Sequence, residues 1–127
     1  MENETYRLTF FLNATHMVTI DGKDSSIHPH TFEINCFIKS QKFTAFETME
    51  NSINQILNQL NNQYLNELEA FKNIVPTLEN LTRLLYRAIS ANLGSVGCKL
   101  VELEVAESPV RTFIIKENYR ERDRSHL

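Results

Sequence analysis

Two segments near the start of the chain alternate apolar and polar residues, and this pattern constrains the fold more than any other feature of the sequence. Residues 6–14 and 32–38 place an apolar side chain at every second position. This is the period of a strand that has one buried and one exposed face. The stretch between them contains Asp21-Gly22 and a pair of serines. We therefore expect an antiparallel hairpin with a long polar loop.

The period changes at Phe46, where apolar residues begin to recur at spacings of three and four. This spacing predicts a helix with one apolar stripe. The stripe contains Phe46, Met49, Ile53, Ile56, Leu57 and Leu60.

A second helix is predicted to follow Thr77, which is a good N-cap, and to stop near Gly94. Its stripe contains Leu78, Leu81, Leu85 and Ala88. Two more strands are expected, one with Val101, Leu103 and Val105 on its apolar face and one around residues 110–116. The predicted order is ββααββ, an α+β fold.

Length and charge limit the classes of protein that fit. The 127 residues suit one domain, which we place at 1–117, followed by a charged tail at 118–127. A net charge of -3 offers no basic face for nucleic acid. No apolar stretch approaches the ~20 residues that cross a bilayer, and the first residues are acidic rather than signal-like, so we expect a cytoplasmic protein without a membrane partner. The spacing of Cys36 and Cys98 indicates structural thiols.

Three of the four histidines lie around the predicted hairpin. His16 lies near the end of the first strand, and His28 and His30 lie at the start of the second. Residues i and i+2 of a strand share a face, so two imidazoles from one strand and a third from its neighbour can form a facial set. Three neutral nitrogens with one open position are typical of a catalytic zinc. The spacing alone also fits two partly exposed strand histidines.

The surroundings of these histidines resemble the 6-pyruvoyl-tetrahydropterin synthase / 6-carboxy-tetrahydropterin synthase family. Phe-Leu-Asn-Ala-Thr-His at 11–16 is similar to its aromatic-x-x-Ala-x-His motif, and His-Pro-His-Thr-Phe at 28–32 is similar to its His-Gly-His-aromatic motif. Three later segments also resemble the family, in the right order. These are Leu-Asn-Asn-Gln-Tyr-Leu-Asn at 60–66, Pro-Thr-Leu-Glu-Asn-Leu at 76–81 and Val-Ala-Glu-Ser at 105–108.

The resemblance implies the tunnelling fold, with an antiparallel four-stranded sheet and two helices on one face. It also implies a homohexamer, in which trimers close a barrel and two trimers stack, with active sites between subunits. By resemblance, His16, His28 and His30 bind Zn²⁺ and Glu107 receives the ring of a pterin-like ligand. A carboxylate can accept two parallel hydrogen bonds from a 2-amino-4-oxo-pyrimidine, which suits that role. Without the resemblance, Glu107 would be read as an exposed residue at a strand end.

The chain departs from the family at the positions that handle protons. Asp24 stands where synthases usually have a cysteine base, and Asn61 and Asn62 stand where they have an Asp-His pair. An amide orients a substrate but does not exchange protons near neutral pH. Two hypotheses follow. The protein is a zinc enzyme of pterin or deazapurine metabolism with Asp24 as base, or it is an inactive pterin- or purine-binding or regulatory homo-oligomer in which Asp24 is a loop carboxylate.

Overall fold

A computed structural model describes residues 3–118 of the chain, and the charged tail predicted from 118 lies almost wholly outside them. Four long strands and two helices form the body of the molecule in the predicted order ββααββ. They are β1 (Tyr6–His16), β4 (His28–Ser40), α1 (Phe46–Leu60), α2 (Leu78–Gly94), β6 (Cys98–Ser108) and β7 (Arg111–Lys116). Shorter elements lie between them, namely β2 (Thr19–Ile20), β3 (Lys23–Asp24), β5 (Gln63–Tyr64) and the 3-10 helices η1 (Leu65–Glu67) and η2 (Glu69–Phe71).

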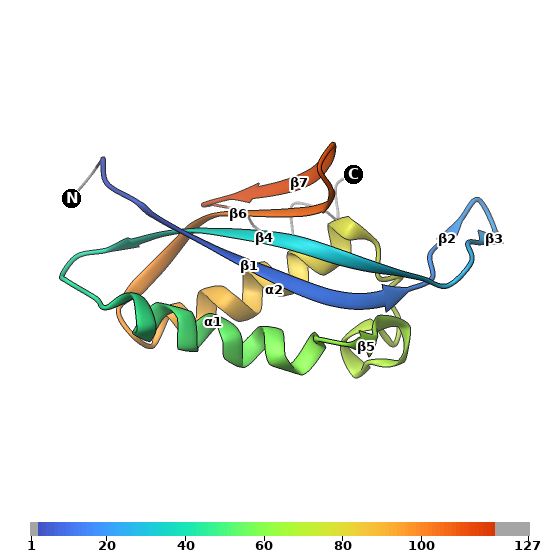
Figure 1. Cartoon of the computed structure of the whole chain (residues 1–127), viewed down its shortest axis with the longest axis horizontal. Helices are drawn as coiled ribbons and strands as arrows, with labels where there is room; N and C mark the ends of the chain where they lie inside the picture. Colours follow the sequence, from blue (N-terminus) through green and yellow to red (C-terminus); the bar gives the residue numbers. More distant parts are fainter. Residues whose placement is uncertain (1–2, 119–127) are drawn as a thin grey trace.

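The sheet has the strand order β5-β1-β4-β6-β7, and both helices cover one of its faces (Figure 1). Its four long strands are antiparallel to their neighbours, as predicted. The fifth strand was not predicted. It is the two-residue β5, which runs parallel to β1 beside Ala14 and Thr15.

The predicted hairpin of β1 and β4 is confirmed over its full length. The register runs from Tyr6 opposite Ile38 to His16 opposite His28. The connecting loop forms a small ladder of its own, in which β2 pairs with β3 and extends beyond the sheet (Figure 1). Asp21 and Gly22 turn this ladder with φ angles of 53° and 77°. Two positive φ angles in a two-residue turn match the right-handed twist of the flanking strands, and they explain the Asp-Gly pair.

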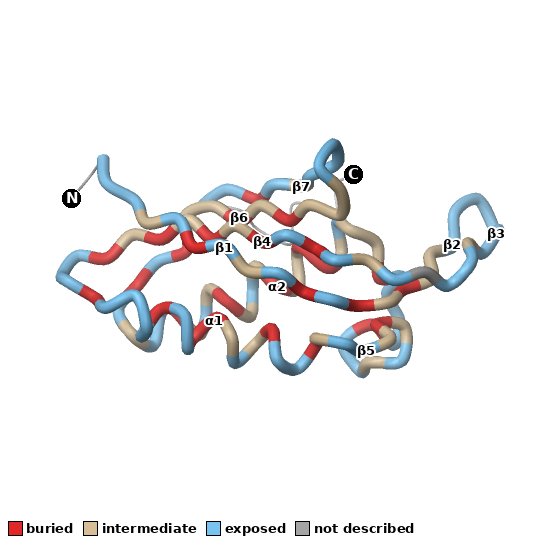
Figure 2. The backbone as a smooth tube through the Cα atoms, in the orientation of Figure 1, coloured by how far each residue is buried: buried red, intermediate tan, exposed pale blue. Residues whose placement is uncertain are grey.

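The hydrophobic core fills the space between the sheet and the two helices, and buried residues alternate along the strands as predicted (Figure 2). On α1, Met49, Ile53 and Leu57 are buried. The prediction for Phe46 was wrong, because its side chain is 56% exposed. As the first residue of α1, Phe46 packs edge-on against the ring of Tyr6 at the start of β1, with centroids 5.5 Å apart.

The start of α2 is also confirmed. The hydroxyl of Thr77 accepts a hydrogen bond from the backbone N–H of Asn80 at 3.1 Å, which satisfies one of the donors that a helix leaves free at its N-terminus. The helix ends at Gly94. No helix within residues 3–118 is both long enough and apolar enough to span a membrane.

Strand β6 contains two bulges that the alternation could not reveal. Leu100 lies opposite Ile38 and Glu102 lies opposite Phe37, so Val101 is an extra residue between them. The bulge reverses the inward side of the strand, which is why Leu100 and Leu103 are buried while Val101 is only half-buried. The prediction that Val101 belongs to the apolar face with Leu103 was therefore wrong.

Candidate metal centre

His16 and His30 lie at one end of the sheet, on the face that the helices cover. Each continues the inward alternation of its strand, His16 after Ala14 on β1 and His30 before Phe32 on β4. The two imidazole rings are nearly perpendicular, at 88°, with centroids 4.9 Å apart. The ring of Phe32 packs below both, at 5.8 Å from His16 and 5.5 Å from His30. The hairpin register thus brings together two of the three predicted ligands.

The orientation of the His16 ring is set by a backbone carbonyl far away in sequence. Nδ1 of His16 lies 2.7 Å from the carbonyl oxygen of Pro76, and His16 is only 3% exposed. Because a carbonyl oxygen can only accept, Nδ1 carries the proton and the lone pair of the neutral ring is on Nε2. Metal-binding histidines are commonly oriented in this way. His16 therefore has the tautomer that suits a ligand.

The chain just beyond His16 is held by Asn66. The side-chain amide of Asn66 accepts from the backbone N–H of Met17 and donates to the carbonyl oxygen of the same residue, both at 2.8 Å. This amide mimics the pairing of a neighbouring strand and fixes the end of β1. Asn66 and Pro76 were not predicted as site residues. Both lie in segments that resemble the family, at 60–66 and 76–81, but a contact made by a backbone carbonyl group leaves no signal in residue type.

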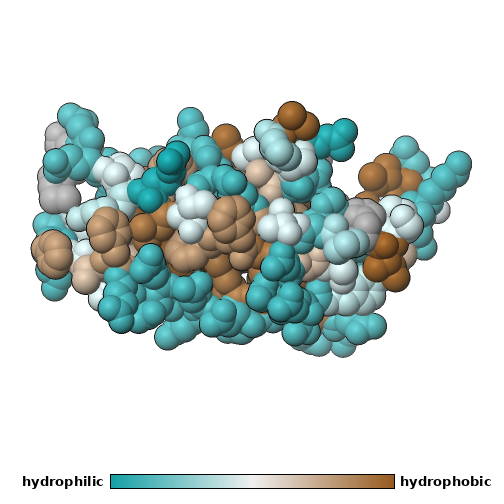
Figure 3. All heavy atoms as spheres, viewed as in Figure 1, coloured by the Kyte–Doolittle hydropathy of each residue, from teal (hydrophilic) through white to brown (hydrophobic). Residues whose placement is uncertain are grey.

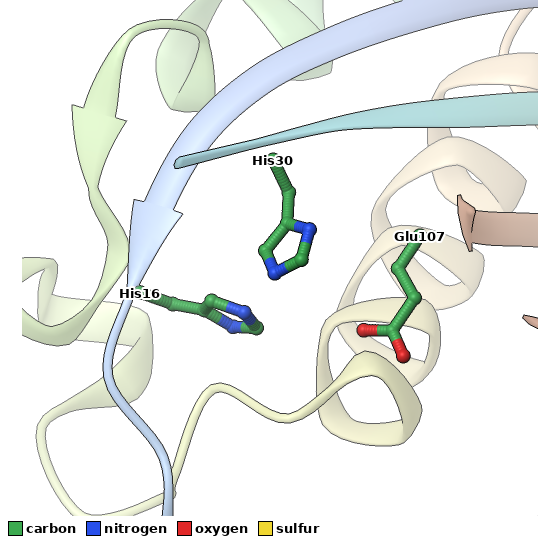
Figure 4. A group of neighbouring side chains, drawn as sticks. All are labelled: His16, His30 and Glu107. Atoms are coloured by element: carbon green, nitrogen blue, oxygen red, sulfur yellow. The ribbon is translucent and has the colours of Figure 1, made fainter. Parts of the chain in front are cut away.

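Glu107 reaches the two histidines from the second bulge of β6. Ala106 pairs with Thr112 and Ser108 pairs with Arg111, so Glu107 is the unpaired residue between them. Bulges beside functional sites often redirect one side chain. The ligand atoms of His16, His30 and Glu107 all lie within 4.8 Å of one another, and the three side chains point toward a common centre (Figure 4). They form a candidate metal site.

The carboxylate of Glu107 forms no hydrogen bond or ion pair with the side chains and backbone that the structure describes, although its side chain is half-buried. A half-buried carboxylate without donors is unfavourable unless a cation or an N–H group binds there. Two imidazoles and a carboxylate are also a donor set that zinc accepts. The residues present therefore fit a divalent metal ion.

The cluster opens into a hollow of about 590 Å³. Its other walls come from β2, the start of α2 and the turn between β6 and β7. The lining residues that carry charge are Glu79 and Arg111, and the apolar ones include Ile20, Val110 and Phe113. Ile20 and Val110 are 64% and 87% exposed. Hydrophobic surface is visible both at the β2–β3 hairpin and beside the β6–β7 turn in Figure 3. The hollow is large enough for a small planar ligand.

The remaining predicted site residues lie elsewhere or cannot be placed. The backbone of His28 pairs with His16, but its side chain lies outside the described part of the structure. Asp24 is exposed at the end of β3, where it accepts a hydrogen bond from the hydroxyl of Thr19 at 2.5 Å. It is not among the residues that line the hollow around His16 and His30.

Asn61 and Asn62 join α1 to the edge of β1. The backbone N–H of Asn13 donates to the side-chain oxygen of Asn61 at 3.0 Å, and the backbone N–H of Asn62 donates to the carbonyl oxygen of Asn13 at 2.6 Å. Asn62 has a φ of 61°, in the left-handed region that asparagine tolerates better than most residues. Both asparagines thus have structural roles at the end of the helix.

Comparison with solved structures shows the same architecture in several proteins. The chain is similar to 6-pyruvoyl tetrahydropterin synthase from Caenorhabditis elegans, with 17% identity, a TM-score of 0.76 and coverage of 91% of this chain and 96% of that one. An uncharacterised protein from Wolinella succinogenes matches with 12% identity, a TM-score of 0.70 and coverage of 91% and 98%. A catalytic-residue mutant of the Plasmodium vivax synthase matches with 11% identity, a TM-score of 0.66 and coverage of 92% and 100%.

Among curated protein sequences, none matches the chain significantly. The family model described as 6-pyruvoyl tetrahydropterin synthase, however, matches residues 5–118. Together with the shared architecture, this confirms the predicted tunnelling fold of two helices on an antiparallel-dominated sheet. The chain belongs to the 6-pyruvoyl tetrahydropterin synthase family.

Proposed function

We propose that this protein is a zinc-dependent member of its family that acts on a dihydroneopterin-type pterin, with altered chemistry. The observation that carries the proposal is the convergence of His16, His30 and Glu107 at a hollow in the family's fold. Bound zinc would polarise a hydroxyl or carbonyl group on the side chain of the ligand. The protein residues would hold the ligand and move its protons.

The zinc ligands in this proposal are His16, His28 and His30. Support for His28 comes from the backbone, because His28 lies directly opposite His16 and two residues before His30 on the same strand. Positions i and i+2 of a strand share a face. The tautomer that Pro76 imposes on His16 supports the same site.

Glu107 is proposed as the acceptor for the pterin ring. Its carboxylate makes no hydrogen bond or ion pair with the described residues, so both oxygens can accept from a planar donor pair. The hollow beside it has apolar walls that suit a flat ring, including Phe113. Ring binding at Glu107 is common to both functional hypotheses.

Asp24 is proposed as the general base in place of the usual cysteine. It is ionisable, and a P. vivax synthase carries a glutamate, replaced by alanine in one of the solved structures, that is described as a catalytic residue. An acidic residue can therefore be catalytic in a protein of this fold. Within a single chain, Asp24 lies on the projecting β2–β3 ladder (Figure 1), so it would have to reach the ligand through a movement of that ladder or across a subunit boundary.

The alternative proposal is a homo-oligomer that binds a pterin or purine without turnover. The structural roles of Asn61 and Asn62 favour it, because neither side chain titrates, and the Asn61 side-chain oxygen and the Asn62 backbone N–H tie the end of α1 to β1. An assembly of this kind would keep the zinc and the Glu107 pocket. It would lack the ionisable side chains that an enzyme needs in order to move protons.

A homohexamer built from two stacked trimers is proposed for both alternatives. Within the described residues, β7 has no strand on its outer side, and β1 is covered on its outer side only by β5. Such edges tend to pair with another chain. Phe11 on β1 and Ile114 on β7 are 62% and 45% exposed, and pairing of β1 with β7 of a second copy would cover them. A monomeric mass in sedimentation at micromolar concentration would contradict the proposal.

The deciding experiment measures zinc and turnover on the same preparation. We expect one zinc per chain by elemental analysis of protein purified without chelator, and loss of that zinc in His30→Ala. The zinc-loaded protein is then incubated with dihydroneopterin triphosphate and with dihydroneopterin. Product formation favours the enzyme. Binding without product favours the assembly, and the absence of both zinc and pterin binding would refute the proposed function.

A further inference from the structure

The position of Glu107 creates a geometric conflict with its role as ring acceptor. Ordinary bond lengths place the amino edge of a pterin roughly 8 Å from a hydroxyl on its first side-chain carbon. A hydrogen bond of about 2.9 Å at one end and a metal bond of about 2.1 Å at the other would then separate the carboxylate from the metal by roughly 10–13 Å, depending on the bond angles at the two ends. In the structure, Glu107 instead lies within 4.8 Å of the ligand atoms of His16 and His30.

The observed separation is close to what a metal ion needs. Ligand atoms on a tetrahedral zinc, at about 2.1 Å from the metal, are roughly 3.4 Å apart. The cluster would have to contract by at most about 1.4 Å to bind the ion, which side-chain rotation can supply. Glu107 forms no hydrogen bond or ion pair with the described residues that would hold it in another place (Figure 4).

We propose that Glu107 is a ligand of the metal ion when the hollow is empty and leaves the metal when a ring binds. This inference deepens the proposed function and rests on its metal site. Together with the histidine ligands of the proposed function, Glu107 would complete four-coordination, the closed state of a zinc site. Its departure would open the position that a ligand hydroxyl needs. The same carboxylate then accepts the N–H groups of the ring.

The unpaired position of Glu107 on β6 is suited to this exchange. The residue lies in a bulge, so its backbone is not locked into both neighbouring strands as a regular ladder residue would be. The side chain has three rotatable bonds, and Arg111 on the wall of the same hollow forms no ion pair with it. Movement between two positions therefore breaks no interaction among the described residues.

The first test measures zinc affinity by competition with a chromophoric chelator, and the absorption spectrum of the Co²⁺-substituted protein. Glu107→Gln should lower zinc affinity by about tenfold or more and shift the Co²⁺ bands, because one anionic ligand is lost. Glu79→Gln is the matched control, since Glu79 lines the same hollow but is not in the cluster. It should keep zinc affinity within about twofold. Circular dichroism checks that both variants fold.

The second test uses unsubstituted pterin, which has the ring but no side-chain hydroxyl. If zinc and the ring compete for Glu107, the zinc-free protein binds pterin more tightly than the zinc-loaded protein, and pterin weakens zinc binding by the same factor. Glu107→Gln should abolish this coupling. Equal zinc affinities of wild type and Glu107→Gln would overturn the inference while leaving the proposed function intact. If wild type binds no zinc, or His30→Ala binds it as well as wild type does, the metal site itself is wrong and both proposals fail.

Discussion

Nδ1 of His16 lies 2.7 Å from the carbonyl oxygen of Pro76, which joins the last residue of β1 to the residue pair that precedes α2. One imidazole thus closes a contact between elements 60 residues apart while its other nitrogen is oriented toward the candidate metal site. Stability and metal binding therefore depend on different atoms of the same side chain, and two substitutions can separate them.

His16→Asn places an amide nitrogen near the position of Nδ1, whereas His16→Gln places an amide near the position of Nε2. We expect His16→Asn to keep the hydrogen bond to Pro76 and most of the free energy of unfolding. His16→Gln leaves the buried carbonyl without its donor and should lower that free energy by about 1–3 kcal/mol. Both should lose zinc affinity. Urea unfolding and zinc titration of the two variants measure these effects, and equal stabilities would show that the Pro76 contact does not hold the ring.

Asn61 and Asn62 should prove structural at the end of α1. Asn61→Ala removes the acceptor of the Asn13 N–H and should cost about 1 kcal/mol, while Asn61→Asp keeps the acceptor and should cost less. At Asn62, with its φ of 61°, alanine should also cost about 1 kcal/mol and glycine should be nearly neutral. Thermal unfolding of these four variants tests the pattern. A uniform loss across all four would contradict it.

Glu104, on the solvent-facing side of the sheet, should make the stability of the protein depend on pH. Desolvation by burial, reinforced by a hydrogen bond with Glu102, raises the pKa of Glu104 above its ordinary value. The folded protein therefore holds this proton more tightly than the unfolded chain does. Stability should fall as the pH rises from the ordinary carboxyl pKa through the raised value, and should then remain lower.

Glu104→Gln removes this contribution. We expect the variant to be more stable than wild type at neutral pH and to lose less stability between about pH 4 and pH 7. Glu50→Gln, an exposed carboxylate on α1, serves as the control and should follow the wild-type profile. If the urea midpoints of Glu104→Gln and wild type run parallel across this range, Glu104 does not shape the profile.

The two thiols should resist modification while the protein is folded. Burial raises the pKa of Cys36 to about 12, and its side chain is fully buried on β4. Because the thiolate is the reactive form, Cys36 should react with a disulfide reagent only as fast as the protein opens. Cys98→Ala leaves Cys36 as the reporter, and its labelling should become rapid in urea. Rapid labelling in buffer would contradict the buried position.

The sequence predicted the parts of the fold that periodicity controls. The alternation on β1 and β4, the burial of Leu81 and Leu85 on α2 and the Thr77 cap were confirmed because each follows from local geometry and the burial of apolar groups. The bulges at Val101 and Glu107 could not be predicted, since an extra residue in one strand is visible only when its partner is known. The exposure of Phe46 also depends on a partner that the helical pattern does not reveal, because its ring packs against Tyr6 at the start of β1.

The candidate site, like the fold, was predictable only where it depends on the alternation of the strands. The hairpin register follows from the alternation, and it brings His16 and His30 together. The resemblance directed attention to Glu107, but its position beside the histidines depends on a bulge. The carbonyl of Pro76 and the amide of Asn66 act through backbone groups and long-range contacts that residue types do not reveal.

Asp24 remains the residue that separates an enzyme from a binding assembly. As a general base it must come within hydrogen-bond distance of the ligand, directly or through one water, although in the single chain it is exposed and bonded to Thr19. Asp24→Asn keeps its size and shape but removes the proton acceptor, and should lower any turnover of dihydroneopterin substrates by about 10²-fold or more with nearly unchanged pterin affinity. Asp21→Asn is the matched control, because Asp21 lies in the turn of the same ladder, and it should keep full turnover. Asp24→Cys alone should recover little, since Asn61 and Asn62 would still not relay protons. If Asp24→Asn keeps the turnover of wild type, Asp24 only closes the β2–β3 ladder and another group moves the proton.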